Sequence, residues 1–228
     1  MREGAKGRNF LIHHSLTGWD RYLDAGAFFR EGQRRELFQR DALAEMEKDP
    51  LREARKRLRQ HDGNWLSAAQ SLDLHNYLPL DILTKVDRMS MAHSLEVRVP
   101  LLDHTLVEFA ATVPPELNLN GGGGKGLFKK AMRGIVPDAV IDRPKRGFAL
   151  PLSFWFRGDM EGFARDLLLS RRSSERNIIN TQYVARLLDL HRGGRPLDLQ
   201  LWTLISFELW CRTFLDQRPA SAAVRASA

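Results

Sequence analysis

Residues 73–103, DLHNYLPLDILTKVDRMSMAHSLEVRVPLLD, mix apolar side chains that could fill a core with charged side chains that stand between them. A charged group inside a protein must be paired or bind a ligand, because its removal from water is costly. We therefore expect this segment to be partly buried and to line a polar site. Its charged and titratable members are Asp81, Lys85, Asp87, Arg88, His93, Glu96, Arg98 and Asp103.

The middle of this segment has a helical pattern. Pro79 precedes LDILTKVDRMSMAHSL, whose apolar spacing predicts a helix of about four turns over residues 80–95. Asp81 and Lys85 are four residues apart, so they are expected to form an ion pair on one face of this helix.

The end of the segment is expected to be extended. In EVRVPLLD, residues 96–103, apolar and polar side chains alternate, and Pro100 disfavours helix at the residue before it. Asp103 then follows as the N-cap of a short amphipathic helix. Asn64 and Asn180 stand at the starts of two other helical patterns and are expected to cap them.

A second polar segment, RPKRGF at residues 143–148, holds three cations within four positions. Arg143, Lys145 and Arg146 are bracketed by a proline, which stiffens the backbone, and a glycine, which permits unusual dihedral angles. Cations held in place in this way suit an anion site. A solvated basic turn is the alternative that these residues leave open.

A strongly basic helix is expected over residues 50–61, PLREARKRLRQH, because proline suits a helix start. A solvated helix face and contact with a phosphate-rich partner are the two interpretations of these cations, and the residues leave both open.

The glycine-rich segment NLNGGGGKG, residues 118–126, invites comparison with a phosphate-binding Walker A loop. That motif needs glycine at 119 and serine or threonine at 126, where this chain has Leu119 and Gly126. We therefore predict a mobile surface loop here.

Composition excludes several classes of protein. The 228 residues carry a net charge of +7 and are 43% hydrophobic, which predicts a folded core and favours anionic ligands. Because the positive charge is scattered, it is weak evidence for nucleic-acid binding. Cys211 is the single cysteine, so neither a disulfide framework nor a multi-cysteine zinc site can form, and a reducing cytoplasmic location is expected. No apolar run approaches the ~20 residues of a membrane span, and no secretory signal is evident.

Helical patterns run through most of the chain and strand patterns are scarce, which predicts a mainly α fold. Residues 196–216 are apolar almost all round, so this helix is expected in the middle of the fold. We expect a flexible N-terminal segment at 1–17, a folded domain at 18–217 and a disordered tail at 218–228.

The polar segments together resemble a known family. The string D-R-x-S-M-A-x-x-L-E-x-R-x-P-x-L-D at 87–103 and the string R-x-K-x-x-F at 143–148 resemble the synthetase domain of glutamine-dependent asparagine synthetases. The resemblance extends from about Tyr22 to Leu215. It implies that residues 18–217 are a partial asparagine synthetase domain: the helical C-terminal portion of an α/β adenine-nucleotide α-hydrolase-like (ATP-pyrophosphatase) domain, with little or no sheet.

The resemblance also implies a chemistry. Such enzymes use ATP and Mg²⁺ to adenylate the side-chain carboxylate of aspartate and release pyrophosphate. Ammonia made from glutamine in a separate N-terminal domain then displaces AMP.

Roles for individual residues follow from their places in these strings. Lys145 is implied as the catalytic cation near the phosphates, with Arg143, Lys85, Asp87 and Arg88 binding substrate or phosphate. A structural role is expected for Glu96 and Arg98, which pair with neighbours, and for the cap Asp103. No residue is assigned to a metal.

Other family motifs are missing from these 228 residues. The S-G-G-x-D-S pyrophosphate loop and an S-G-x-G-x-D-E string do not occur, and Arg2 stands where the glutaminase domain needs cysteine. We therefore expect a C-terminal fragment, or half of a split enzyme whose partner chain supplies the missing N-terminal half, inactive by itself.

Two alternatives remain. Relatives of this fold amidate sugars or peptides, or close β-lactam rings, and the sequence does not reveal which carboxylate is used. The other alternative is a helical polyanion-binding module with basic faces at 51–60 and 125–146. The scarcity of interleaved aromatic residues in these faces disfavours nucleic acid as its ligand.

Overall fold

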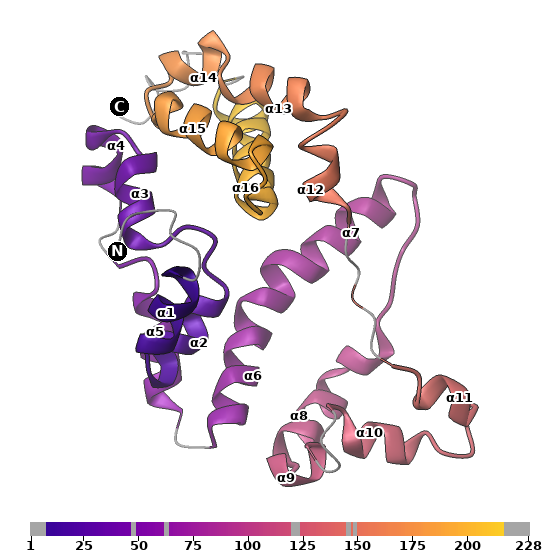
Figure 1. Ribbon diagram of the computed structural model, residues 1–228. Helices are drawn as coiled ribbons and strands as arrows, with labels where there is room; N and C mark the ends of the chain where they lie inside the picture. Colours follow the sequence, from indigo (N-terminus) through magenta and orange to yellow (C-terminus); the bar gives the residue numbers. More distant parts are fainter. Residues whose placement is uncertain are drawn as a thin grey trace, which may run out of the picture. The chain divides into compact units, whose positions relative to one another are not determined.

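The computed structural model describes residues 8–46, 49–61, 64–119, 124–144, 147 and 150–216. The chain divides into two compact units, unit 1 (Met1–Lys48 with Phe148–Ala228) and unit 2 (Asp49–Gly147). The described residues form helices joined by turns; they contain two isolated β-bridges and no strand (Figure 1). The prediction of a mainly α chain is confirmed.

Unit 1 combines four helices from the start of the chain with helices from its last third. The first set is α1 (Arg8–Ser15), α2 (Gly18–Ala25), α3 (Glu31–Leu37) and α4 (Arg40–Glu45). The second set is α12 (Leu152–Trp155), α13 (Glu161–Leu168), α14 (Arg171–Glu175), α15 (Thr181–Arg192), α16 (Asp198–Trp210) and the π-helical turn η3 (Cys211–Leu215).

These two sets lie side by side where α3 meets the start of α15 (Figure 1). The backbone amide of Gln39 donates to the carbonyl of Ile178 at 2.9 Å, and the amide of Asn180 donates to the carbonyl of Leu37 at 2.7 Å. The side chain of Asn180 accepts a hydrogen bond from the amide of Gln182 at 3.1 Å. This confirms Asn180 as the predicted cap of α15.

The core of unit 1 lies between α3, α12, α13, α15 and α16. Helix α16 contributes one face to it, whereas Trp202 and Trp210 remain almost half exposed. The predicted long helix is therefore confirmed, but its burial holds for one face only. The buried core residues are Leu37, Leu152, Phe156, Ala164, Leu167, Leu168, Ile179, Tyr183, Val184, Leu187, Leu188, Leu201, Leu204 and Ile205.

A buried charge cluster ties the end of α16 to the residue after α14. The side chain of Glu208 is 2% exposed and accepts hydrogen bonds from Arg176 Nη1 at 2.6 Å and Arg212 Nε at 2.7 Å. Arg176 also donates to Asp216 at 2.7 Å. Burial alone would raise the pKa of Glu208, but the two guanidinium groups outweigh burial and hold the pKa below its ordinary value. Glu208 therefore stays charged within the core.

His191, near the end of α15, is a second buried titratable group of unit 1. Its residue is 0% exposed, and Nδ1 accepts a hydrogen bond from the amide of Leu197 at 3.2 Å. Burial lowers the pKa of this imidazole, because the charged form loses its contact with water, and the nearby Arg157 lowers it further. The neutral imidazole is thus the form that the fold favours.

Unit 2 consists of short helices on either side of one long helical run. Helices α6 (Trp65–His75), η1 (Leu78–Leu83, π-helical) and α7 (Thr84–Met91) follow one another almost without a break (Figure 1). The remaining elements are α5 (Arg52–Gln60), the 3₁₀ turn η2 (Pro100–Leu102), α8 (His104–Thr112), α9 (Pro115–Asn118), α10 (Gly126–Ala131) and α11 (Asp138–Ile141).

The described core of unit 2 is small. Helix α5 packs on α6, and the side chain of Asn64 caps α6 by accepting a hydrogen bond from the amide of Leu66 at 2.7 Å, as predicted. The buried hydrophobic residues of the unit are Leu58, Ala68, Ala69, Leu72 and Ile141.

Some predictions on flexible segments lie outside the described residues. Of the expected N-terminal segment 1–17, residues 8–15 form α1, and residues 1–7 are not described. Residues 120–123 of the glycine-rich loop and the tail 218–228 are also not described. Among the described residues, no helix is long and apolar enough to cross a membrane.

Replacing Glu208 by glutamine should destabilise unit 1 strongly. The substitution leaves two guanidinium groups facing a neutral amide in the core, and loss of one partner of a buried ion pair costs about 3–5 kcal/mol. Urea unfolding followed by circular dichroism measures this loss. Glu175→Gln, which breaks the exposed Arg171–Glu175 pair, is the control and should cost about 0.5 kcal/mol or less. Equal effects of the two substitutions would contradict the role assigned to Glu208.

The free energy of unfolding should fall as pH drops below about 6.5, the ordinary pKa of histidine. The folded-state pKa of His191 is lowered, so the unfolded chain binds more protons in this range. Urea titrations at a series of pH values should show a smaller fall for His191→Gln than for the unmodified chain. His75→Gln, at an exposed position, should retain the full pH dependence. An undiminished slope in His191→Gln would exclude His191 as its source.

Candidate functional site

The predicted site residues all belong to unit 2, where two segments hold them. The first runs through η1 and α7 to the start of α8, and the second follows α11. Helix η1 contains Pro79, which has no amide hydrogen to donate, and the hydroxyl of Thr84 donates to the Pro79 carbonyl at 2.7 Å. π-Helical turns of this kind occur frequently at functional sites.

Helix α7 presents three of the predicted side chains to solvent. Lys85 Nζ lies 3.3 Å from Asp81 Oδ1 one turn earlier, so the predicted ion pair is confirmed. Asp87 and Arg88 are exposed, and within the described part of the chain neither side chain forms an ion pair. Their charges therefore remain available to a ligand.

The prediction that residues 73–103 are partly buried is wrong within unit 2. All the charged members of the segment are exposed, and so are many apolar members. Periodicity shows which side chains share a face but does not show what covers that face, and no described residue of unit 2 buries these side chains. The exposed large apolar residues from α6 to α8 are Trp65, Leu74, Tyr77, Leu80, Met89, Met91, Leu95, Val97, Val99, Leu101, Leu106 and Phe109.

The structural roles predicted at the end of the segment agree with local geometry. Arg98 forms an ion pair with Glu96 across the extended stretch. Asp103 Oδ1 accepts a hydrogen bond from the amide of Thr105 at 3.0 Å and caps α8. The Thr105 hydroxyl and amide together hold the pKa of Asp103 below its ordinary value.

An arginine that the sequence did not single out fixes the approach to the basic turn. Arg133, just after α10, donates to Asp138 Oδ1 at 2.7 Å and to Asp142 Oδ2 at 2.8 Å. The hydrogen bonds from Arg133 hold the pKa of Asp142 below its ordinary value. Because Asp142 immediately precedes Arg143, this clamp anchors the residue from which the basic turn begins.

The turn itself is described only in part. Arg143 is exposed, and within the described residues its side chain forms no ion pair. Lys145 and Arg146 lie outside the described residues, so the predicted catalytic position of Lys145 is untested. No hydrogen bond or ion pair joins Arg143 to α7 within the described part of unit 2. The same part of the chain contains no group of three or more His, Cys, Asp or Glu side chains that could hold a metal ion.

Spacing could not have revealed Arg133, because positions 133, 138 and 142 do not share a face of one helix. The signal that was available is the pair of aspartates around α11, one of which directly precedes the R-x-K-x-x-F string. A short, exposed helix of this kind needs a tether from outside itself, and Arg133 provides it.

Comparison with known proteins gives a consistent match. The asparagine synthase family model matches residues 8–212. Asparagine synthetase (glutamine-hydrolyzing) 1 of Bacillus subtilis (strain 168) is 30% identical over 219 residues, which are 96% of this chain and 34% of that protein. A putative asparagine synthetase of Mycobacterium tuberculosis (strain ATCC 25618 / H37Rv) is 31% identical over 223 residues, 95% of this chain and 33% of that protein.

A more distant similarity is to the amidase chry2 of Gibberella zeae, 26% identical over 128 residues, which are 53% of this chain and 19% of that protein. No solved structure matches the chain. The chain spans about a third of the length of the two synthetases. The match to the family model covers both polar segments and most of both units. The chain belongs to the asparagine synthase family.

Proposed function

We propose that this chain supplies the helical part of the site at which an ATP-dependent, glutamine-hydrolysing asparagine synthase activates aspartate. The observation that carries the proposal is the family match over residues 8–212, which includes both the 73–103 segment and the basic turn. Family membership favours this enzyme over the polyanion-binding module.

In the proposed reaction, the side-chain carboxylate of aspartate attacks the α-phosphorus of ATP, and the bond to pyrophosphate breaks. Ammonia, released when glutamine is hydrolysed to glutamate, then attacks the acyl-adenylate and displaces AMP. Negative charge builds up on the phosphoryl oxygens and on the leaving pyrophosphate during the first step. Fixed cations near these oxygens stabilise that transition state.

Lys145 is the residue that we assign to this role, with Arg143 as its helper. Supporting the assignment, the clamp from Arg133 anchors Asp142 and so restricts where the turn begins. Lys85, Asp87 and Arg88 are proposed to bind substrate or phosphate from α7. Their exposed side chains leave them accessible to a ligand.

The complete site requires parts that these 228 residues do not contain. We assign the helices to an adenine-nucleotide α-hydrolase-like domain whose sheet and S-G-G-x-D-S loop come from a further N-terminal part or from a partner chain. The many large apolar side chains that unit 2 exposes support this proposal, because extensive exposed apolar surface is typical of regions that bind another protein part. By itself the chain is expected neither to hydrolyse glutamine nor to make asparagine.

Two further parts of the proposal concern metal and location. The described residues do not provide the set of carboxylates that a resident Mg²⁺ would need, so we assign no metal ligand to this chain. Mg²⁺ would arrive with the phosphates of ATP.

The single cysteine supports a cytoplasmic enzyme.

Amidation of another carboxylate is the second candidate function. The 26% identity to the amidase chry2 over about half of this chain keeps it open, because similarity in this region extends to a protein that is not named for asparagine synthesis. Comparing aspartate with other carboxylic acids as acceptors in the completed enzyme separates the two candidates.

A chimera tests the role of Lys145. These 228 residues would replace the matching third of the Bacillus subtilis synthetase, and asparagine and glutamate formation would be measured separately. Lys145→Ala should reduce asparagine synthesis by about 10²–10³-fold, the usual effect of removing a group that stabilises transition-state charge, and should leave glutaminase activity intact. Lys130→Ala is the control and should change neither rate. Unchanged synthesis in Lys145→Ala would remove this lysine from the site.

The positioning role of Arg133 makes a separate prediction. Arg133→Gln removes the tether to Asp138 and Asp142, so the backbone amides of residues 138–143 should exchange hydrogen faster in the isolated chain. In the chimera, synthesis should fall by roughly tenfold to a hundredfold, because a misplaced catalytic group reacts more slowly. Normal exchange rates in this variant would show that the clamp does not order the turn.

A further inference from the structure

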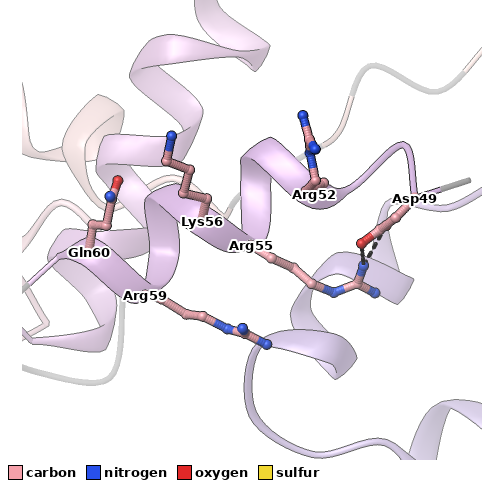
Figure 2. A pocket seen from close by; sticks show the side chains of 6 residues that line it. All are labelled: Asp49, Arg52, Arg55, Lys56, Arg59 and Gln60. Carbon is pink, nitrogen blue, oxygen red and sulfur yellow. Dashed lines mark hydrogen bonds and ion pairs between the residues drawn. The ribbon is translucent and has the colours of Figure 1, made fainter. Parts of the chain in front are cut away.

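Unit 2 carries a surface hollow of about 310 Å³ beside α5 (Figure 2), and its lining includes none of the residues proposed for synthesis. This volume is at the lower end of the range for small-molecule sites. Its lining consists of Asp49, Arg52, Arg55, Lys56, Arg59 and Gln60.

The cations form two rows along the helix. Arg52 and Lys56 are one turn apart and extend in one direction, whereas Arg55 and Arg59 extend together in another (Figure 2). Residues four apart on a helix are separated by about 6 Å along its axis. Each row therefore offers two positive charges to groups spaced at a similar distance.

The lining holds more positive than negative side chains. Asp49 is its one carboxylate against four cations, and it lies 2.6 Å from Arg55. Arg52 reaches Glu53, which is outside the lining, at 3.7 Å. Lys56 and Arg59 form no ion pair within the described part of the chain. Counted over the lining residues alone, the formal charge is +3, with Glu53 beside Arg52 outside that count.

This arrangement does not serve the stability of α5. Like charges four residues apart destabilise a helix, and cations in the first turn oppose the helix dipole. The helix is anchored by Leu58, which is 2% exposed and does not belong to the lining. Packing needs Leu58 and does not need the cations, so an anion that neutralises them would stabilise the unit.

We propose that this hollow binds an oligophosphate, an anion of two or three linked phosphates. Arginine forks match the oxygens of phosphate groups, and two rows of cations can contact more than one phosphate at a time. The lining has no aromatic side chain on which a nucleic-acid base could stack, which separates this ligand from single-stranded nucleic acid. Inorganic oligophosphates and the phosphate chains of nucleotides share this chemistry. The inference does not depend on the proposed synthase site.

Calorimetric titration of the full 228-residue chain with inorganic triphosphate tests the proposal. The double substitution Lys56→Gln/Arg59→Gln should weaken binding by about tenfold or more, because two charge-assisted contacts are lost. The control Lys129→Gln/Lys130→Gln removes the same charge from α10 and should leave binding unchanged. Asp49→Asn should tighten binding, because it removes the carboxylate that competes for Arg55.

Parallel titrations with ATP and AMP distinguish the two sources of the ligand. Equal affinities for ATP and triphosphate would indicate an inorganic ligand. Tighter binding of ATP would indicate a nucleotide. Either result supports an oligophosphate site. Circular dichroism of each variant confirms that the helices are retained. The proposal is overturned if triphosphate does not bind, if the α5 and α10 variants lose the same affinity, or if a single-stranded RNA without terminal phosphates binds α5 more tightly than triphosphate.

Discussion

Unit 2 exposes large apolar side chains along α6, α7 and the following extended stretch, and its own buried core offers little to cover them. Leu80 and Met89 are more than 60% exposed, whereas the described core consists of two leucines, two alanines and one isoleucine. Burial of apolar surface is worth about 25 cal/mol per Å², so this uncovered surface is a substantial reserve of binding free energy. The exposed charges of α7 belong to the same segment as this apolar surface.

Unit 1 buries the apolar side chains of one face of α16 in its own core. Helices from the two ends of the sequence enclose an apolar core, and Glu208 fixes the end of α16 through Arg176 and Arg212. A charged cluster in a core adds specificity only when every charge has a partner. On its other side α16 still exposes Trp202 and Trp210, so both units carry apolar surface beyond what each buries.

Local features of the fold could be predicted because neighbouring residues determine them. Asn64, Asp103 and Asn180 cap helices as expected, and the Asp81–Lys85 pair follows from one turn of helix. The burial of residues 73–103 could not be predicted, because burial depends on distant segments. The ion pairs of Arg133 could not be predicted, because its partners do not follow helical spacing. The basic turn was identified from its string of residues, but Lys145, the lysine predicted to be catalytic, lies outside the described residues.

Release of pyrophosphate by the purified 228-residue chain, supplied with ATP, aspartate and ammonium, is the most direct measurement of the central claim. Ammonium bypasses any need for glutaminase, so the assay addresses only the activating site. If the helices are one part of that site and the phosphate loop must come from elsewhere, release should equal that of a sample without protein. Release of pyrophosphate above that level, dependent on aspartate, would contradict the account, because the helices alone would then suffice for adenylation.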